Sequence, residues 1–111
     1  MTRTLLAAFA GALIFAAAPA PAQPAPAAGT IKIDNFTFGP QALTVAVGTT
    51  VTWINQDDIP HIVVSSDGKS FRSKVLDTGD RFSFTFARPG SFGYFCSIHP
   101  HMTGTVLVKP R

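Results

Sequence analysis

From Thr30 to the C-terminus, short stretches of alternating apolar and polar residues are separated by turn residues. Alternation with a period of two places apolar side chains on one face of a strand, whereas no sustained helical stripe is present. Nine glycines and nine prolines are spread along the chain, which leaves little room for long helices. The pattern therefore predicts an all-β fold.

The spacing of these stretches fits eight strands packed as a β-sandwich. The predicted strands cover residues 30–36, 42–47, 50–55, 61–65, 71–76, 81–86, 91–96 and 103–109. Phe82, Phe84 and Phe86 alternate with Ser83 and Thr85, so three aromatic rings share one face. We predict that this face belongs to the core.

The N-terminal segment is expected to lie outside this domain. A positive start with Arg3, an apolar run over residues 5–18 and small residues around Ala22 are typical of an export signal. A membrane span needs about 20 apolar residues, so an uncleaved anchor is the weaker alternative. We predict a cleaved signal peptide over residues 1–22, a flexible Pro/Ala linker over 23–29 and a periplasmic domain over 30–111 with no membrane span.

Charge and cysteine content exclude several other classes. With 14% charged and 46% apolar residues the chain is not intrinsically disordered, and one cysteine forms no internal disulfide. The formal net charge of +3 is too dispersed to indicate a nucleic-acid partner. We expect a monomer that does not bind nucleic acid.

The residues with metal-binding chemistry gather near the C-terminus. Cys96, His99 and Met102 follow one another at three-residue steps, and His61, directly after Pro60, is the histidine remote from this segment. Thiolate and thioether ligands favour copper, and a trigonal His₂Cys set with a weak axial Met is the donor set of electron-transfer copper sites. The sequence therefore predicts a copper site.

Each of these residues taken alone also has an ordinary structural explanation. A lone cysteine is usually a small buried hydrophobe, a lone methionine fills the core, and a lone histidine sits at a strand edge. Asn55, Asp57 and Asp58 by themselves are ordinary turn residues. An unpaired thiol is a liability in an oxidising compartment unless it is ligated, so the joint pattern favours the metal.

Two segments of the chain resemble the cupredoxins, and among them the amicyanins. They are VTWIN at residues 51–55 followed by Pro60-His61, and Cys96-x-x-His99-Pro100-x-Met102. The resemblance covers residues 30–109 and implies an eight-stranded Greek-key β-sandwich that binds one copper ion, cycling between Cu(I) and Cu(II).

Ligand roles also follow from this resemblance. It implies that His61, Cys96 and His99 are strong equatorial ligands, that Met102 is the weak axial ligand, and that Asn55 ties the His61 loop to the Cys96 loop.

Two departures from the family pattern carry predictions of their own. Ile98 stands where amicyanins typically carry proline, and we predict that its N–H points at the Cys96 sulfur and raises the reduction potential. His101 replaces an aromatic residue, but Met102 keeps the axial position because it alone preserves the family register.

The resemblance implies a type 1 copper protein that carries single electrons and is not an enzyme. His99 is expected to reach the surface and to meet a cytochrome c or a dehydrogenase by transient docking. The apolar patch expected around it comprises Ile59, Pro60, Ile98, Pro100 and Met102.

Three alternatives remain open from the sequence. The cluster of His99, His101 and Met102 also suits a periplasmic copper-trafficking or copper-resistance protein. An enzyme with Cys96 as nucleophile is less favoured because no orienting group or oxyanion site is evident. Structural zinc usually takes more cysteines and no thioether.

Overall fold

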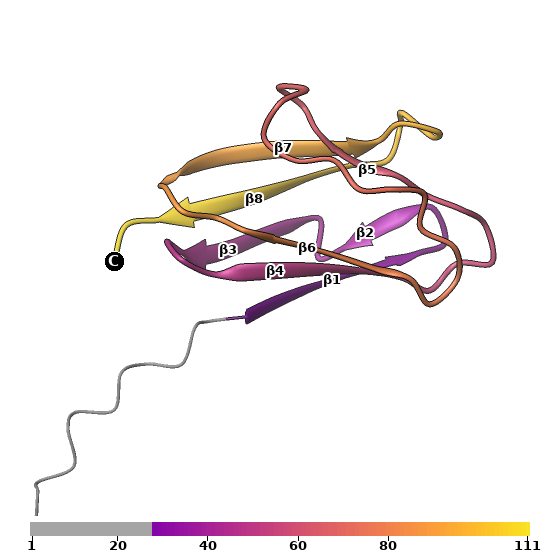
Figure 1. Ribbon diagram of the computed structural model, residues 1–111, viewed down its shortest axis with the longest axis horizontal. Helices are drawn as coiled ribbons and strands as arrows, with labels where there is room; N and C mark the ends of the chain where they lie inside the picture. Colours follow the sequence, from indigo (N-terminus) through magenta and orange to yellow (C-terminus); the bar gives the residue numbers. More distant parts are fainter. Residues whose placement is uncertain (1–27) are drawn as a thin grey trace, which may run out of the picture.

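The computed structural model describes residues 28–111, which form eight strands in two packed sheets (Figure 1). The strands are β1 (Ala28–Asp34), β2 (Thr37–Gly39), β3 (Ala42–Ala46), β4 (Thr50–Asn55), β5 (Val63–Ser65), β6 (Arg81–Thr85), β7 (Gly90–Cys96) and β8 (Thr103–Lys109). β1 thus begins slightly before the predicted domain start at Thr30. The signal peptide and most of the predicted linker lie outside the described residues.

The strand order is β2-β1-β4-β6 in one sheet and β3-β8-β7-β5 in the other. β1 pairs in parallel with β4, and β3 with β8, while the remaining pairs are antiparallel. The all-β sandwich predicted from the alternating pattern is confirmed. Residues 28–111 contain no helix long and apolar enough to cross a membrane.

Two strand assignments differ from the prediction. Residues 71–76 form no strand of their own, and their β pairing is limited to the isolated bridges Val64–Arg72 and His61–Leu76. Between these bridges the Ser73 hydroxyl accepts the Val63 N–H, so a side chain replaces part of a regular ladder. The total of eight strands is reached instead by the short β2, which pairs with the end of β1.

A tight turn at Asn35 and Phe36 explains why β2 was missed. Both residues have positive φ, 49° and 58°, and Asp34 pairs directly with Thr37 across the turn. Two successive left-handed residues are the geometry of the type I′ hairpin turn, in which Asn is common. The bulky second residue concealed the turn inside an apparently continuous strand.

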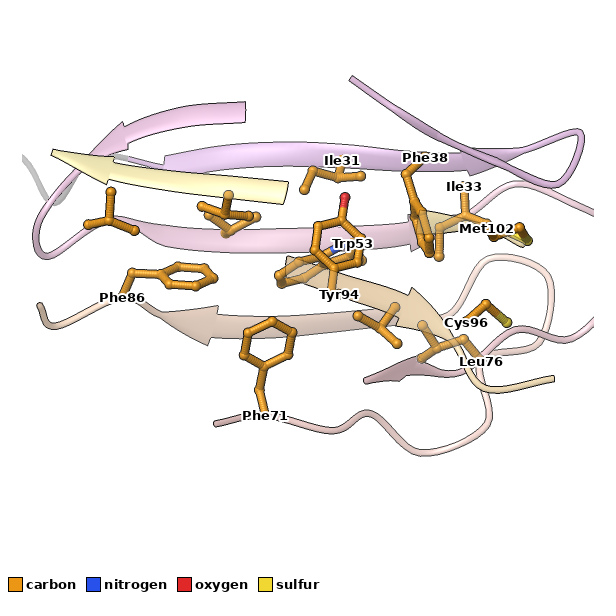
Figure 2. Close-up of a cluster of buried hydrophobic side chains, with 14 residues drawn as sticks. Ile31, Ile33, Phe38, Trp53, Phe71, Leu76, Phe86, Tyr94, Cys96 and Met102 are labelled. Carbon is orange, nitrogen blue, oxygen red and sulfur yellow. The ribbon is translucent and has the colours of Figure 1, made fainter. Parts of the chain in front are cut away.

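Aromatic side chains fill the space between the sheets (Figure 2). Trp53 on β4 packs against Phe71, Phe82 and Tyr94 at ring-centroid distances of 5.3 to 5.6 Å. Phe86 is buried as predicted, and it lies at the opposite end of this core from Cys96 (Figure 2). The aromatic core therefore fixes how the two sheets stack on each other, and with it the position of the end of β7.

Candidate metal centre

The end of β7 and the start of β8 place three of the predicted residues. β7 ends at Cys96, whose N–H donates to the Met102 carbonyl at 3.0 Å, and the Met102 N–H donates to the His99 carbonyl at 2.9 Å. These two bonds close a compact loop between antiparallel strands. Cys96, His99 and Met102 are thereby held at one end of the sandwich.

His61 reaches the same end from a different part of the chain. Its N–H donates to the Leu76 carbonyl at 3.0 Å, and the Leu76 N–H donates back at 2.8 Å. The Ser97 N–H donates to the Ile62 carbonyl at 3.1 Å, which joins the His61 segment to the Cys96 loop. His61 is fully buried, and these backbone hydrogen bonds fix the position of the segment that carries it.

Three donor atoms converge at this point. The Cys96 Sγ lies 3.6 Å from His61 Nδ1 and 3.7 Å from His99 Nδ1, and all three atoms lie within 4.8 Å of one another. A metal ion at about 2.0 Å from nitrogen and about 2.3 Å from sulfur, with trigonal angles of about 120°, separates sulfur from nitrogen by about 3.7 Å. Both sulfur–nitrogen distances therefore match those of a trigonal metal site.

Met102 and His101 differ sharply in exposure. Met102 is 4% exposed and lies with Cys96 at one end of the core, whereas His101 is exposed. A hollow of about 140 Å³ between β2 and the loop is lined by both residues together with Phe36 and Phe38. Met102 is thus part of the buried cluster, and His101 faces outward beside it.

The hydrogen bond to the cysteine sulfur does not come from the predicted residue. The Ile62 N–H donates to Cys96 Sγ, with the nitrogen 3.4 Å away, whereas Ile98 is 47% exposed and makes no such bond in the described part of the chain. The predicted bond from the Ile98 N–H to the sulfur is therefore wrong, while the effect of Ile98 on the reduction potential stays a prediction. The donor comes from the His61 segment because that segment pairs with the end of β7.

Asn55 also binds different partners from those that the resemblance implied. Its Nδ2 donates to the carbonyls of Ile59 and Leu76, each at 2.9 Å, and its Oδ1 accepts the Asp57 N–H at 2.9 Å. No bond from its side chain to the Cys96 loop occurs among residues 28–111. Asn55 instead shapes the loop that leads from β4 to His61.

Asp57 is a site residue that the sequence prediction treated as an ordinary turn residue. Its Oδ2 lies 2.8 Å from His61 Nε2, while its two carboxylate oxygens accept the N–H groups of Asn35 and Phe36 at 2.6 and 3.0 Å. Burial opposes ionisation, but the bonds from Phe36, His61 and Asn35 outweigh it and lower the pKa of Asp57. Its spacing of four residues before His61 was the available signal.

Phe36 is the second residue that the prediction missed. Its ring meets the His99 and His61 rings edge-on, with centroids 5.1 and 5.8 Å apart, and it is 43% exposed. Of the patch expected around His99, Pro60, Ile98 and Pro100 are exposed, Ile59 is half-buried and Met102 is buried. Phe36 therefore supplies apolar surface that had been assigned to Met102.

Comparisons with known proteins agree with this arrangement. Residues 5–108 match the family model described as a cupredoxin-like domain. The chain is 34% identical to amicyanin-alpha of Methylorubrum extorquens over 110 residues, covering 94% of this chain and 92% of that protein.

Solved structures show the same similarity. A purple cupredoxin from Nitrosopumilus maritimus is 38% identical with a TM-score of 0.68, covering 73% of this chain and 99% of that one. A reduced amicyanin mutant is 30% identical with a TM-score of 0.70, covering 79% and 88%.

Proposed function

This chain belongs to the cupredoxin-like family, and on that premise we propose that it carries single electrons between redox partners in the periplasm. Its cofactor is copper, as the soft donor set and the family indicate. We assign His61, Cys96 and His99 as the strong ligands and Met102 as the weak axial ligand. When bound, the copper ion supplies a one-electron couple between Cu(I) and Cu(II).

The observation that carries this proposal is the convergence of one sulfur and two imidazole nitrogens from remote segments. Cys96 and His61 are fully buried, and backbone hydrogen bonds fix the segments on which they lie. Ligands that are held in place before an electron arrives need little rearrangement when it does. A rigid and largely buried ligand set suits repeated electron transfer.

The surface around His99 suits brief contact with a partner protein. His99 is half-buried, and the exposed side chains of Phe36, Pro60, Ile98 and Pro100 surround the end of the sandwich where it lies. Small apolar surfaces are typical of weak and rapidly dissociating redox complexes. We propose that a cytochrome c or a dehydrogenase docks here and exchanges the electron through His99.

A copper-trafficking or copper-resistance function is the alternative, and one observation favours it. The exposed His101 and the buried Met102 line the same hollow, so imidazole and thioether donors lead from the surface toward the site. An enzyme with a Cys96 nucleophile is not favoured, because the thiol is 0% exposed. The two binding functions differ in whether the copper leaves the protein.

The test of the proposed site is to add Cu(II) to the purified protein lacking residues 1–22. We expect a strong blue thiolate-to-copper absorption band and a narrow copper hyperfine splitting in the paramagnetic resonance spectrum. Cys96→Ser should abolish the band, Met102→Leu should keep much of it, and the matched control His101→Ala should leave it unchanged. A band that survives in Cys96→Ser would show that the ligand assignment is wrong.

The same preparation separates the carrier from the trafficking protein. A carrier should retain its copper through repeated cycles of chemical reduction and oxidation in the presence of a Cu(I) chelator. A trafficking protein should lose Cu(I) to the chelator within the first cycles. Loss of copper from wild type but not from His101→Ala would favour trafficking.

A further inference from the structure

We infer that Asp57 is a positioning residue for the metal centre, because one carboxylate orients His61 and also fixes the β1–β2 turn that lays Phe36 against both imidazoles. This inference rests on the proposed function, since it treats His61 as a copper ligand. It assigns a role to a residue that contacts no donor atom of Cys96 or His99.

The contact with His61 determines which ring nitrogen is free. The Asp57 carboxylate lies 2.8 Å from Nε2, while Nδ1 faces the Cys96 sulfur at 3.6 Å. An ionised carboxylate only accepts hydrogen bonds, so the neutral imidazole carries its proton on Nε2. The Nδ1 lone pair is then directed at the metal position, and the ring is held at the correct rotation.

The contacts with the turn use both oxygens of the same carboxylate: Oδ1 accepts the Asn35 N–H, and Oδ2, which also meets His61, accepts the Phe36 N–H. Asn35 and Phe36 both have positive φ, a backbone conformation that is strained for a bulky residue such as Phe36. Their two N–H groups both donate to Asp57, which compensates for this strain. Without the carboxylate, the Asn35 and Phe36 N–H groups lose both of their acceptors, and the left-handed conformation of the turn is no longer stabilised.

The turn matters to the site because it carries Phe36. The ring stands edge-on to His61 and His99 and covers them where the protein meets solvent. Asp57 itself is nearly buried, and its own N–H is held by Asn55. The orientation of one ligand and the cover over two ligands therefore depend on a single carboxylate.

The charge of Asp57 also has a consequence for redox balance. A fixed negative charge next to a ligand stabilises the more positive oxidation state, Cu(II). Removing that charge should shift the equilibrium toward Cu(I), and we expect about a tenfold shift, equivalent to about 59 mV in the one-electron potential.

The experiment compares Asp57→Asn with Asp58→Asn, which removes the same charge from an exposed neighbour. In copper-free wild-type protein, nitrogen-15 NMR should show His61 as the Nε2–H tautomer, and the Asn35 and Phe36 amides should exchange slowly. Asp57→Asn should speed the exchange of both amides, and in the copper form it should raise the potential. Asp58→Asn should change the exchange little and the potential by much less.

Each outcome bears on a different part of the inference. An Nδ1–H tautomer in wild type, or equal effects of the two variants on exchange and potential, would overturn it. The tautomer of His61 and the exchange of the Asn35 and Phe36 amides are measured in copper-free wild-type protein. These two measurements therefore remain informative if Asp57→Asn does not fold. If wild type shows the Nε2–H tautomer and slow amide exchange but forms no blue copper band, the proposed function fails and the inference about Asp57 does not.

Discussion

The middle of the sandwich and its metal-binding end bury polar groups in opposite ways. In the middle, the Trp53 Nε1 and the Tyr94 hydroxyl are buried with no hydrogen-bond partner among residues 28–111. At the metal-binding end, the side chains of Asn55, Asp57 and His61 are all paired. The middle is held by ring packing, whereas the end is held by directed bonds.

This difference matches what each region has to do. Aromatic rings contribute to stability through the apolar area that they bury, and a few unpaired polar atoms are tolerated within it. A ligand set requires fixed directions, because a metal ion accepts only certain angles. Substitutions in the aromatic core should therefore change stability without changing the metal site, and substitutions at the metal-binding end should change both.

The largest effect is expected from the aromatic core away from the metal-binding end. Phe86→Ala removes a ring that is 1% exposed and lies far from Cys96 (Figure 2), and it should lower the free energy of unfolding by about 3–5 kcal/mol. Urea unfolding of the copper-free protein measures this, and Leu107→Ala at an exposed position is the control. The copper absorption band of folded Phe86→Ala should match wild type, and a shifted band would show that the regions are coupled.

A smaller loss of stability with an altered site is expected from Asn55→Ala. The substitution leaves the Asp57 N–H and the Ile59 carbonyl without this partner and removes one of the two donors to the Leu76 carbonyl, which should cost about 1–3 kcal/mol. Because the loop also orients His61, the copper band and the reduction potential should change as well. The exposed neighbour Gln56→Ala is the matched control, and an Asn55→Ala protein with an unchanged potential would contradict a directed role for this loop.

The sequence predicted the parts of this comparison that depend on pattern. Alternation over residues 81–86 placed Phe86 inside, and the three-residue steps after Cys96 marked the loop that holds His99 and Met102 beside it. These features are local, so a strand period and a loop length suffice to predict them. The donor types indicated copper, and the family resemblance added the Greek-key topology and the separate ligand roles.

The sequence did not predict the hydrogen bonds that orient the site, because several of them join segments far apart in the chain. Asp57 has its role only because the turn at Asn35 and Phe36 returns beside it. The sulfur accepts the Ile62 N–H because β5 pairs with β7, and no local feature of the Cys96 loop specifies that donor. Such contacts follow from the packing of the two sheets.

The smallest effect at neutral pH is expected from Tyr94→Phe, which removes a buried hydroxyl and keeps the ring. Since no hydrogen bond is lost, the free energy of unfolding should stay within about 1 kcal/mol of wild type.

Alkaline pH should separate Tyr94→Phe from wild type. Burial raises the pKa of Tyr94 to about 12. Between the unfolded-state pKa of about 10 and this value, only the unfolded chain loses the phenol proton, so wild-type stability falls as the pH rises. Urea unfolding from pH 8 to 12 should show Tyr94→Phe losing less stability than wild type. Parallel pH profiles would mean that folding does not raise the pKa of Tyr94, and that the middle of the core does not exclude water from this hydroxyl.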